Sequence, residues 1–165
     1  MREALRGLVR ETLDRTLPPR QVTLLAVVRT LIAYGSLLYI TQELWHILER
    51  SANLPLTVPF LPYLRILHPG RYLKRWRRRL TEESFSHEDA LILSYASFGF
   101  DALEATFGVE IVLTNDLRMK ANYEQCFPRI KARFTRMTRQ LRAPYQQATL
   151  PEVVSLGELH AHLTL

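Results

Sequence analysis

The chain has 165 residues, a length that suits one globular domain and allows burial of about 70% of the unfolded chain's surface. Its 22 Lys and Arg residues against 16 Asp and Glu residues give a net charge of +6, which is typical either of a protein that binds phosphate-bearing partners such as nucleic acid or of a solvated basic surface. A single cysteine, Cys126, excludes an internal disulfide, and the absence of zinc-ligand spacing leaves a reducing, cytoplasmic setting as the expectation.

Residues 1–19 predict a charged amphipathic helix without the apolar centre of a signal peptide, so secretion is not expected. The apolar stretch Val22–Ile40 has the length of a membrane span, but Arg29 near its middle would cost about 2.5–3.5 kcal/mol in a bilayer. We therefore predict a buried helix from Arg20 to Tyr34, a break at Gly35, and then a short strand covered on both faces, with no membrane association.

The middle of the chain predicts helices joined by an irregular connection. A second helix is expected over Glu43–Arg50, and four prolines between Asn53 and Gly70 favour irregular or short-helical structure. The strongly basic segment from Arg71 to Leu80 has apolar residues at helical spacing. Ser86 can then cap an apolar helix that runs to about Phe98.

The last third alternates strand and helix. A strand is predicted over Glu110–Thr114, a turn at Asn115-Asp116, a long amphipathic helix from about Tyr123 to Arg142, and a closing strand from Pro151 to Leu156 before a short helical tail. In that long helix the spacing predicts a buried face. It would comprise Phe127, Ile130, Phe134, Met137 and Leu141. Such an alternation predicts an α/β protein with a parallel sheet flanked by helices, whose ligands lie beyond the carboxyl ends of the strands.

Three acids stand at strand-to-helix junctions: Glu43, Asp89 and Asp116. Clustered carboxylates suit hard divalent ions such as Mg²⁺ or Mn²⁺, which can promote hydrolysis of a phosphodiester. Each acid also has a structural explanation, since acids favour the first turn of a helix and Asp89 or Asp116 can serve in a cap or turn. Position alone leaves both interpretations open.

Four short motifs, in order, resemble the PIN-domain family. The segment His87–Leu93 (HEDALIL) resembles the DAxIL helix of that family, and Ile111–Asp116 (IVLTND) its strand ending in T-N-D. Upstream, Gly35–Leu44 (GSLLYITQEL) is similar to the strand and helix that bear the second acid, and Leu150–Val154 to the closing strand. The resemblance covers roughly Arg20 to Leu159.

This resemblance implies a three-layer α/β/α fold in one domain spanning residues 1–165, and a Mg²⁺- or Mn²⁺-dependent ribonuclease related to toxin–antitoxin toxins. It implies that Glu43, Asp89 and Asp116 form the catalytic metal site and that Thr114 and Asn115 support Asp116. RNA is the implied substrate, and an antitoxin protein or a second copy of the chain are the protein partners that the family allows.

The N-terminus departs from the family pattern, which begins with an apolar strand ending in a first acid. Asp14-Arg15-Thr16 matches that ending, but Arg10 and Glu11 make the preceding segment a poor buried strand. Three interpretations stay open: Asp14 is a displaced metal ligand, the first strand has been lost, or the chain is a truncated reading of a longer gene. The long stretch between Asp89 and Asp116 also leaves room for an extra segment.

Basic residues around Trp76 suit single-stranded RNA, which binds cations and stacking aromatics together. The candidate contacts are Arg71, Lys74, Arg75, Arg77 and Arg78. Alternatively, Trp76 belongs to the buried stripe of a solvated helix. Two hypotheses follow for function: a PIN-type endoribonuclease, or a catalytically defective PIN-like module that binds RNA or a protein partner.

Overall fold

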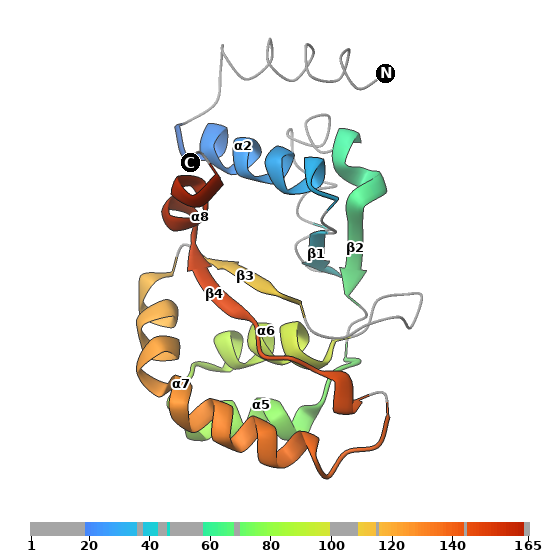
Figure 1. The fold of residues 1–165 in the computed structure, drawn as a ribbon, viewed down its shortest axis with the longest axis vertical. Helices are drawn as coiled ribbons and strands as arrows, with labels where there is room; N and C mark the ends of the chain where they lie inside the picture. Colours follow the sequence, from blue (N-terminus) through green and yellow to red (C-terminus); the bar gives the residue numbers. More distant parts are fainter. Residues whose placement is uncertain are drawn as a thin grey trace. The chain divides into compact units, whose positions relative to one another are not determined.

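The computed structural model describes residues 19–35, 38–42, 46, 58–67, 70–99, 109–114, 116–143 and 145–163 (Figure 1). They form a mixed α/β protein with short strands, as the sequence predicted. The described residues divide into two compact units, one within Met1–Arg65 and Leu156–Leu165, the other within Ile66–Ser155.

The first unit contains helix α2 (Pro19–Ala33), strand β1 (Leu38–Thr41), the 3-10 helix η1 (Val58–Tyr63) and helix α8 (Leu156–Leu163). α8 packs against α2. β1 pairs with β2 (Leu64–Leu67), which spans the boundary between the two units. The predicted helix–break–strand order is therefore confirmed.

α2 ends where the sequence predicted. Gly35 has a φ of +83°, a left-handed conformation that glycine adopts without a steric penalty, and its N–H donates to the carbonyl of Ile32. The expectation for the following strand was wrong in one respect: Leu38 and Tyr39 are half-buried, not covered on both faces. Among the described residues, no helix has the length and apolar character needed to cross a membrane.

The second unit contains α5 (Lys74–Glu82), α6 (His87–Phe98), β3 (Ile111–Thr114), α7 (Leu117–Thr138), the 3-10 turn η2 (Tyr145–Gln147) and β4 (Glu152–Ser155). β3 and β4 are parallel, with Ile111 opposite Glu152 and Thr114 opposite Ser155. α6 and α7 both contact β3, α7 also contacts β4, and α5 packs against α6 (Figure 1). The parallel pairing of the last two strands confirms the expectation for this part of the sheet.

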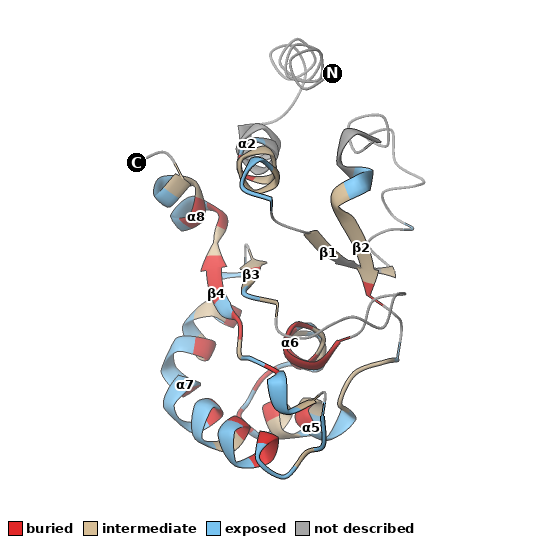
Figure 2. Ribbon diagram, turned by 45° about the vertical axis from the view of Figure 1, so that its right-hand side comes forward, coloured by how far each residue is buried: buried red, intermediate tan, exposed pale blue. Residues whose placement is uncertain are grey.

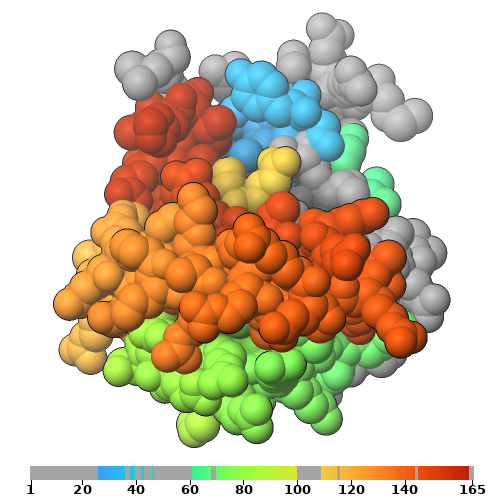
Figure 3. All heavy atoms as spheres, turned by 60° about the horizontal axis from the view of Figure 1, so that its bottom comes forward, coloured from blue at the N-terminus to red at the C-terminus, as the bar shows by residue number. Residues whose placement is uncertain are grey.

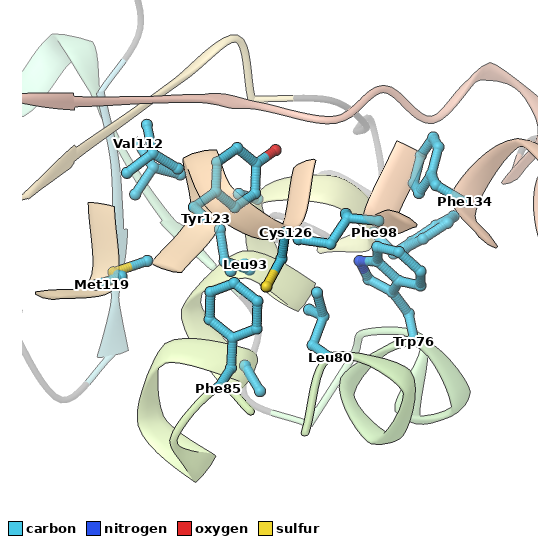
Figure 4. Close-up of a cluster of buried hydrophobic side chains, with 14 of the residues drawn as sticks. Trp76, Leu80, Phe85, Leu93, Phe98, Val112, Met119, Tyr123, Cys126 and Phe134 are labelled. Carbon is cyan, nitrogen blue, oxygen red and sulfur yellow. The ribbon is translucent and has the colours of Figure 1, made fainter. Parts of the chain in front are cut away.

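An aromatic cluster fills the core of the second unit (Figure 4). The ring of Phe134 on α7 lies 5.2 Å from that of Trp76 on α5 and 5.3 Å from that of Phe98 on α6, measured between centroids. These spacings are within the range in which aromatic pairs attract each other. Figure 2 shows the buried residues of α5, α6 and α7 facing one another. The three helices are therefore joined by one shared core.

α7 begins earlier than the sequence predicted, at Leu117 instead of about Tyr123. In its first six residues the apolar Leu117, Met119 and Ala121 alternate with polar residues, and only Met119 is buried, so no helical period marks them. The predicted buried face was also wrong at Phe127, which is 36% exposed, and missed Cys126, which is buried. Pro128 lies inside the helix without ending it.

Candidate functional site

Asp89 is the third residue of α6, in the first turn of the helix. Its backbone N–H donates to the Oγ of Ser86, the N-cap, over 3.0 Å. The side chain of Asp89 does not return a bond to the cap, and its half-buried carboxylate has no hydrogen-bond or ion-pair partner among the described residues. The sequence therefore predicted the cap correctly, but the cap accounts for the backbone of Asp89 and not for its carboxylate.

Asp116 follows β3 directly and is the N-cap of α7. Its Oδ1 accepts hydrogen bonds from the backbone N–H groups of Arg118 and Met119, over 2.8 and 3.2 Å. Oδ2 has no partner among the described residues. One carboxylate oxygen thus stabilises the start of α7, and the other remains available to a ligand.

Thr114, the last residue of β3, holds the turn that presents Asp116. Its Oγ1 accepts a hydrogen bond from the backbone N–H of Asp116 over 3.0 Å. The bond is local, two residues along the chain, and fixes the direction in which the chain leaves the strand. Thr114 therefore contacts the backbone of Asp116, and its supporting role at a metal site stays a prediction.

The structure brings two of the predicted acids to helix N-termini in the same unit. α6 and α7, which carry Asp89 and Asp116, both contact β3. Glu43, Asp14 and Asn115 lie outside the described residues. Within the described part of the chain, no three His, Cys, Asp or Glu side chains are grouped so that they could hold a metal. The complete triad therefore stays a prediction.

The predicted RNA contacts on and before α5 differ in their surroundings. Lys74, Arg75 and Arg78 are exposed. Arg77 is half-buried and donates to the Tyr72 hydroxyl over 3.1 Å and to the His87 carbonyl over 3.4 Å, so it is engaged within the protein.

Arg71, the remaining candidate, is half-buried and has an interaction partner within the protein. Trp76 is 1% exposed and packs into the core. The interpretation of Trp76 as part of a buried stripe is confirmed, and a base cannot stack on its ring while the unit is folded. The basic residues of α5, and not its aromatic residue, are what nucleic acid could reach.

An ion-pair network joins the end of α5 to α7. Glu82 accepts from Arg79 over 2.8 Å and from Arg133 over 2.9 Å. Glu83, only 7% exposed, accepts from the Nε atoms of Arg129 and Arg133 over 2.9 and 2.8 Å. The hydrogen bond from Arg79, and then that from Arg133, holds the pKa of Glu82 below its ordinary value. Hydrogen bonds to the Cys126 sulfur and to Glu83 raise the pKa of Arg129.

Three arginines around this network were not singled out as site residues by the sequence. Arg79, Arg133 and Arg136 line a hollow between α5 and α7, together with Arg75. The sequence could have indicated part of this arrangement. Arg75 and Arg79 are four residues apart and Arg133 and Arg136 are three apart, which places each pair on one helix face.

The chain matches no protein-family model, and it matches none of the curated proteins and none of the solved structures. The resemblance to PIN domains therefore rests on the short motifs alone, and the fold is established here as mixed α/β with a parallel β3–β4 pair.

Proposed function

We propose that the protein is a metal-dependent endoribonuclease of the PIN type that hydrolyses single-stranded RNA in the cytoplasm. The observation that carries the proposal is Asp89, a half-buried residue whose carboxylate has no partner among the described residues. An ionised carboxylate only accepts, and neither oxygen of this one is engaged by the described residues, so both could bind a cation.

The donor chemistry fits a hard divalent cation. The two oxygens of Asp89 and Oδ2 of Asp116 are available, and carboxylate oxygens are the ligands that Mg²⁺ and Mn²⁺ prefer. Glu43 would complete the set from its predicted helix.

Each group has a distinct task in this proposal. Asp89, Asp116 and Glu43 would hold the ion, and Thr114 keeps the turn before Asp116 in place. When bound, the ion supplies positive charge to the phosphate oxygens and makes a water more acidic. Lys74, Arg75 and Arg78 are exposed and would contact phosphates of the RNA backbone.

The test is cleavage of labelled single-stranded RNA by the purified protein with Mg²⁺ or Mn²⁺, stopped by a chelator. We expect Asp89→Asn and Asp116→Asn each to lower the rate by more than about 100-fold, beyond the effect of losing a group that only orients a ligand. Glu88→Gln is the matched control, because it removes one charge from the same helical turn and should retain activity. Undiminished cleavage by both Asn variants would contradict the proposal.

The second candidate is a PIN-like module that binds RNA without cleaving it, or binds a protein partner. The exposed Lys74, Arg75 and Arg78 favour the RNA-binding form. It predicts salt-sensitive binding without turnover, and a salt slope that becomes shallower by about 0.7 for each phosphate contact removed from single-stranded RNA. Lys74→Gln combined with Arg78→Gln should therefore flatten the slope by about 1.4. Turnover by the wild-type protein would exclude this candidate.

If the proposed nuclease is the toxin of a toxin–antitoxin pair, one further prediction follows. Expression of the wild-type chain should arrest growth of the host cell, and expression of Asp116→Asn to the same level should not. An antitoxin protein or a second copy of the chain would then be sought by purifying the inactive variant from cells. Equal growth with both forms would remove the toxin role and leave the cleavage assay to decide on nuclease activity.

A further inference from the structure

A hollow of about 280 Å³ opens between α5 and α7. Its lining comprises four arginines, one methionine and one glutamine: Arg75, Arg79, Arg133, Arg136, Met137 and Gln140. Figure 3 looks at the face on which the spheres of α7 border those of the α5–α6 segment. The hollow is slightly smaller than the roughly 300 Å³ at which typical small-molecule pockets begin, so it suits a small ligand or one end of a longer one.

The charges around the hollow do not cancel. Glu82 and Glu83 are paired with Arg79, Arg129 and Arg133, so three arginines meet two glutamates and one positive charge remains. Arg75 and Arg136 have no ion-pair partner in the described part of the chain and add two more. Three positive charges therefore remain, and this surface favours a ligand that carries two or three negative charges.

Favourable interactions with helix dipoles account for the positions of only some of these arginines. Arg79 and Arg136 lie in the last turns of α5 and α7, where a cation is stabilised by the dipole. Arg75 is the second residue of α5, at the positive end of that dipole, and the first turn contains no acid. A cation at this end of a helix is electrostatically unfavourable unless an anion lies nearby. A bound anion would therefore offset the repulsion between Arg75 and the helix dipole.

The shape of the lining favours phosphate over carboxylate. Arginines of two helices line the hollow, so a ligand there has possible donors on two sides. A phosphate monoester presents several charged oxygens in a tetrahedral arrangement and can engage more than one arginine fork at once. A planar carboxylate matches a single fork. The amide of Gln140 adds a neutral hydrogen-bonding group, and Met137 an apolar wall.

This hollow is remote from the proposed metal site. Arg133 and Arg136 lie near the far end of α7 from Asp116, and the helical rise places them roughly 25–30 Å farther along the axis. We propose that the hollow binds a dianionic phosphate group, held by Arg75 and Arg136 with Arg79 and Arg133 beside them. The phosphate would come either from a small phosphorylated compound or from the 5′ end of an RNA.

The test titrates the isotopically labelled full chain with inorganic phosphate and follows the arginine Nε–H signals. We expect saturable binding by the wild type. The double variant Arg75→Gln/Arg136→Gln should bind at least about tenfold more weakly, as expected from losing a good bidentate contact. The double variant Arg118→Gln/Arg139→Gln is the matched control: it removes the same charge from exposed arginines outside the hollow and should bind within about twofold of the wild type.

Glu82→Gln tests whether a more positive hollow binds phosphate more tightly. It removes the charged partner of Arg79 and one of the two charged partners of Arg133, which keeps Glu83, so phosphate should bind several-fold more tightly than in the wild type. Asp116→Asn should leave phosphate binding unchanged, so this inference can fail or succeed independently of the nuclease proposal. Denaturant unfolding of each variant separates lost binding from lost folding.

The source of the phosphate is distinguished with short oligoribonucleotides. Competition by a 5′-phosphorylated oligomer, but not by its 5′-hydroxyl counterpart, supports an RNA end. Binding of inorganic phosphate without binding of either oligomer supports a small phosphorylated compound.

Three results would overturn the inference. The first is equal phosphate binding by the Arg75/Arg136 double variant and the wild type. The second is competition by both oligomers with equal strength, and the third is binding of acetate and an acidic peptide as tightly as phosphate. The last would assign the hollow to an acidic protein segment.

Discussion

Replacement of Asp116 separates its structural role from its proposed catalytic one. Oδ1 of Asp116 accepts from two backbone N–H groups at the start of α7, and that helix supplies Met119, Tyr123, Ile130 and Phe134 to the core. Loss of an N-cap to alanine costs about 0.5–2 kcal/mol. Because two donors lose their acceptor, we expect about 1.5 kcal/mol for Asp116→Ala.

Asp116→Asn should behave differently. Asparagine caps helices about as well as aspartate, so the two hydrogen bonds are kept and only the charge–dipole term is lost, about 0.3–1 kcal/mol at an exposed site. For a protein of this size each kcal/mol shifts Tm by about 2–4 °C. Asp116→Ala should therefore melt about 3–6 °C below the wild type, and Asp116→Asn, in the same scans, only about 1–4 °C below it.

The assay is urea unfolding followed by circular dichroism, paired with thermal scans of the same samples. If Asp116→Ala is as stable as the wild type, or if the Asn variant loses as much stability as the Ala variant, the Asp116 side chain does not stabilise α7 as a cap. If the cap is confirmed and Asp116→Asn still abolishes cleavage, the loss of activity cannot be attributed to unfolding. A divalent ion present at about 100 times its Kd should also stabilise the wild type by about 2.7 kcal/mol, and the Asn variant by less.

Three further changes test the fold. Ser86→Ala removes the acceptor for the Asp89 N–H and should cost about 1 kcal/mol in urea unfolding. Phe134→Ala opens a cavity beside two aromatic rings and should cost about 3–5 kcal/mol, seen as a lower urea midpoint. Tyr123→Phe removes the hydroxyl that donates to the Pro151 carbonyl over 2.7 Å and should cost about 1–2 kcal/mol. Burial raises the pKa of Tyr123 above its ordinary value, so the wild type should lose stability as the pH rises above about 10, and Tyr123→Phe should lack this loss.

Each of these has a result that would count against it. Unchanged midpoints for Ser86→Ala would mean that water caps α6 equally well. If Phe134→Ala lowers the free energy of unfolding no more than Ser86→Ala does, the aromatic cluster must close over the cavity. Identical alkaline unfolding of the wild type and Tyr123→Phe would mean that Tyr123 does not control this pH range. Constant m-values across the variants are needed for these comparisons to hold.

Elements with local signals were predictable from the sequence. Ser86 and the following apolar run defined α6, and the β-rich run before Asn115 defined β3. β2 was missed because four residues containing Arg65, between prolines, have no strand period that stands out from a loop. The buried face of α7 was ambiguous, because Cys126 and Phe127 both lie three or four residues before Ile130.

How far each candidate site could be predicted from the sequence depended on whether long-range contacts form it. Asp89 and Asp116 were found because each follows a local motif. The arginine-lined hollow was not, because nothing in the sequence states that Arg75 and Arg136 face the same space. That knowledge comes from the packing of α5 against α7, which Glu83 and Arg133 join from distant parts of the chain. Helix spacing identifies the residues on one face, but tertiary packing decides which faces meet.

The parallel pairing of β3 and β4 bears on how the second unit folds. Ile111 meets Glu152 with the whole of α7 between them in the sequence, whereas α5 ends at Glu82 and α6 begins at His87, so these helices pack together through local contacts. Pairing β3 with β4 closes the longer loop, which costs more chain entropy and requires α7 to have formed the crossover between them. We expect the α5–α6 pair to form first and the strands to join last. Until then their unpaired edges are the part of this unit most exposed to self-association during synthesis.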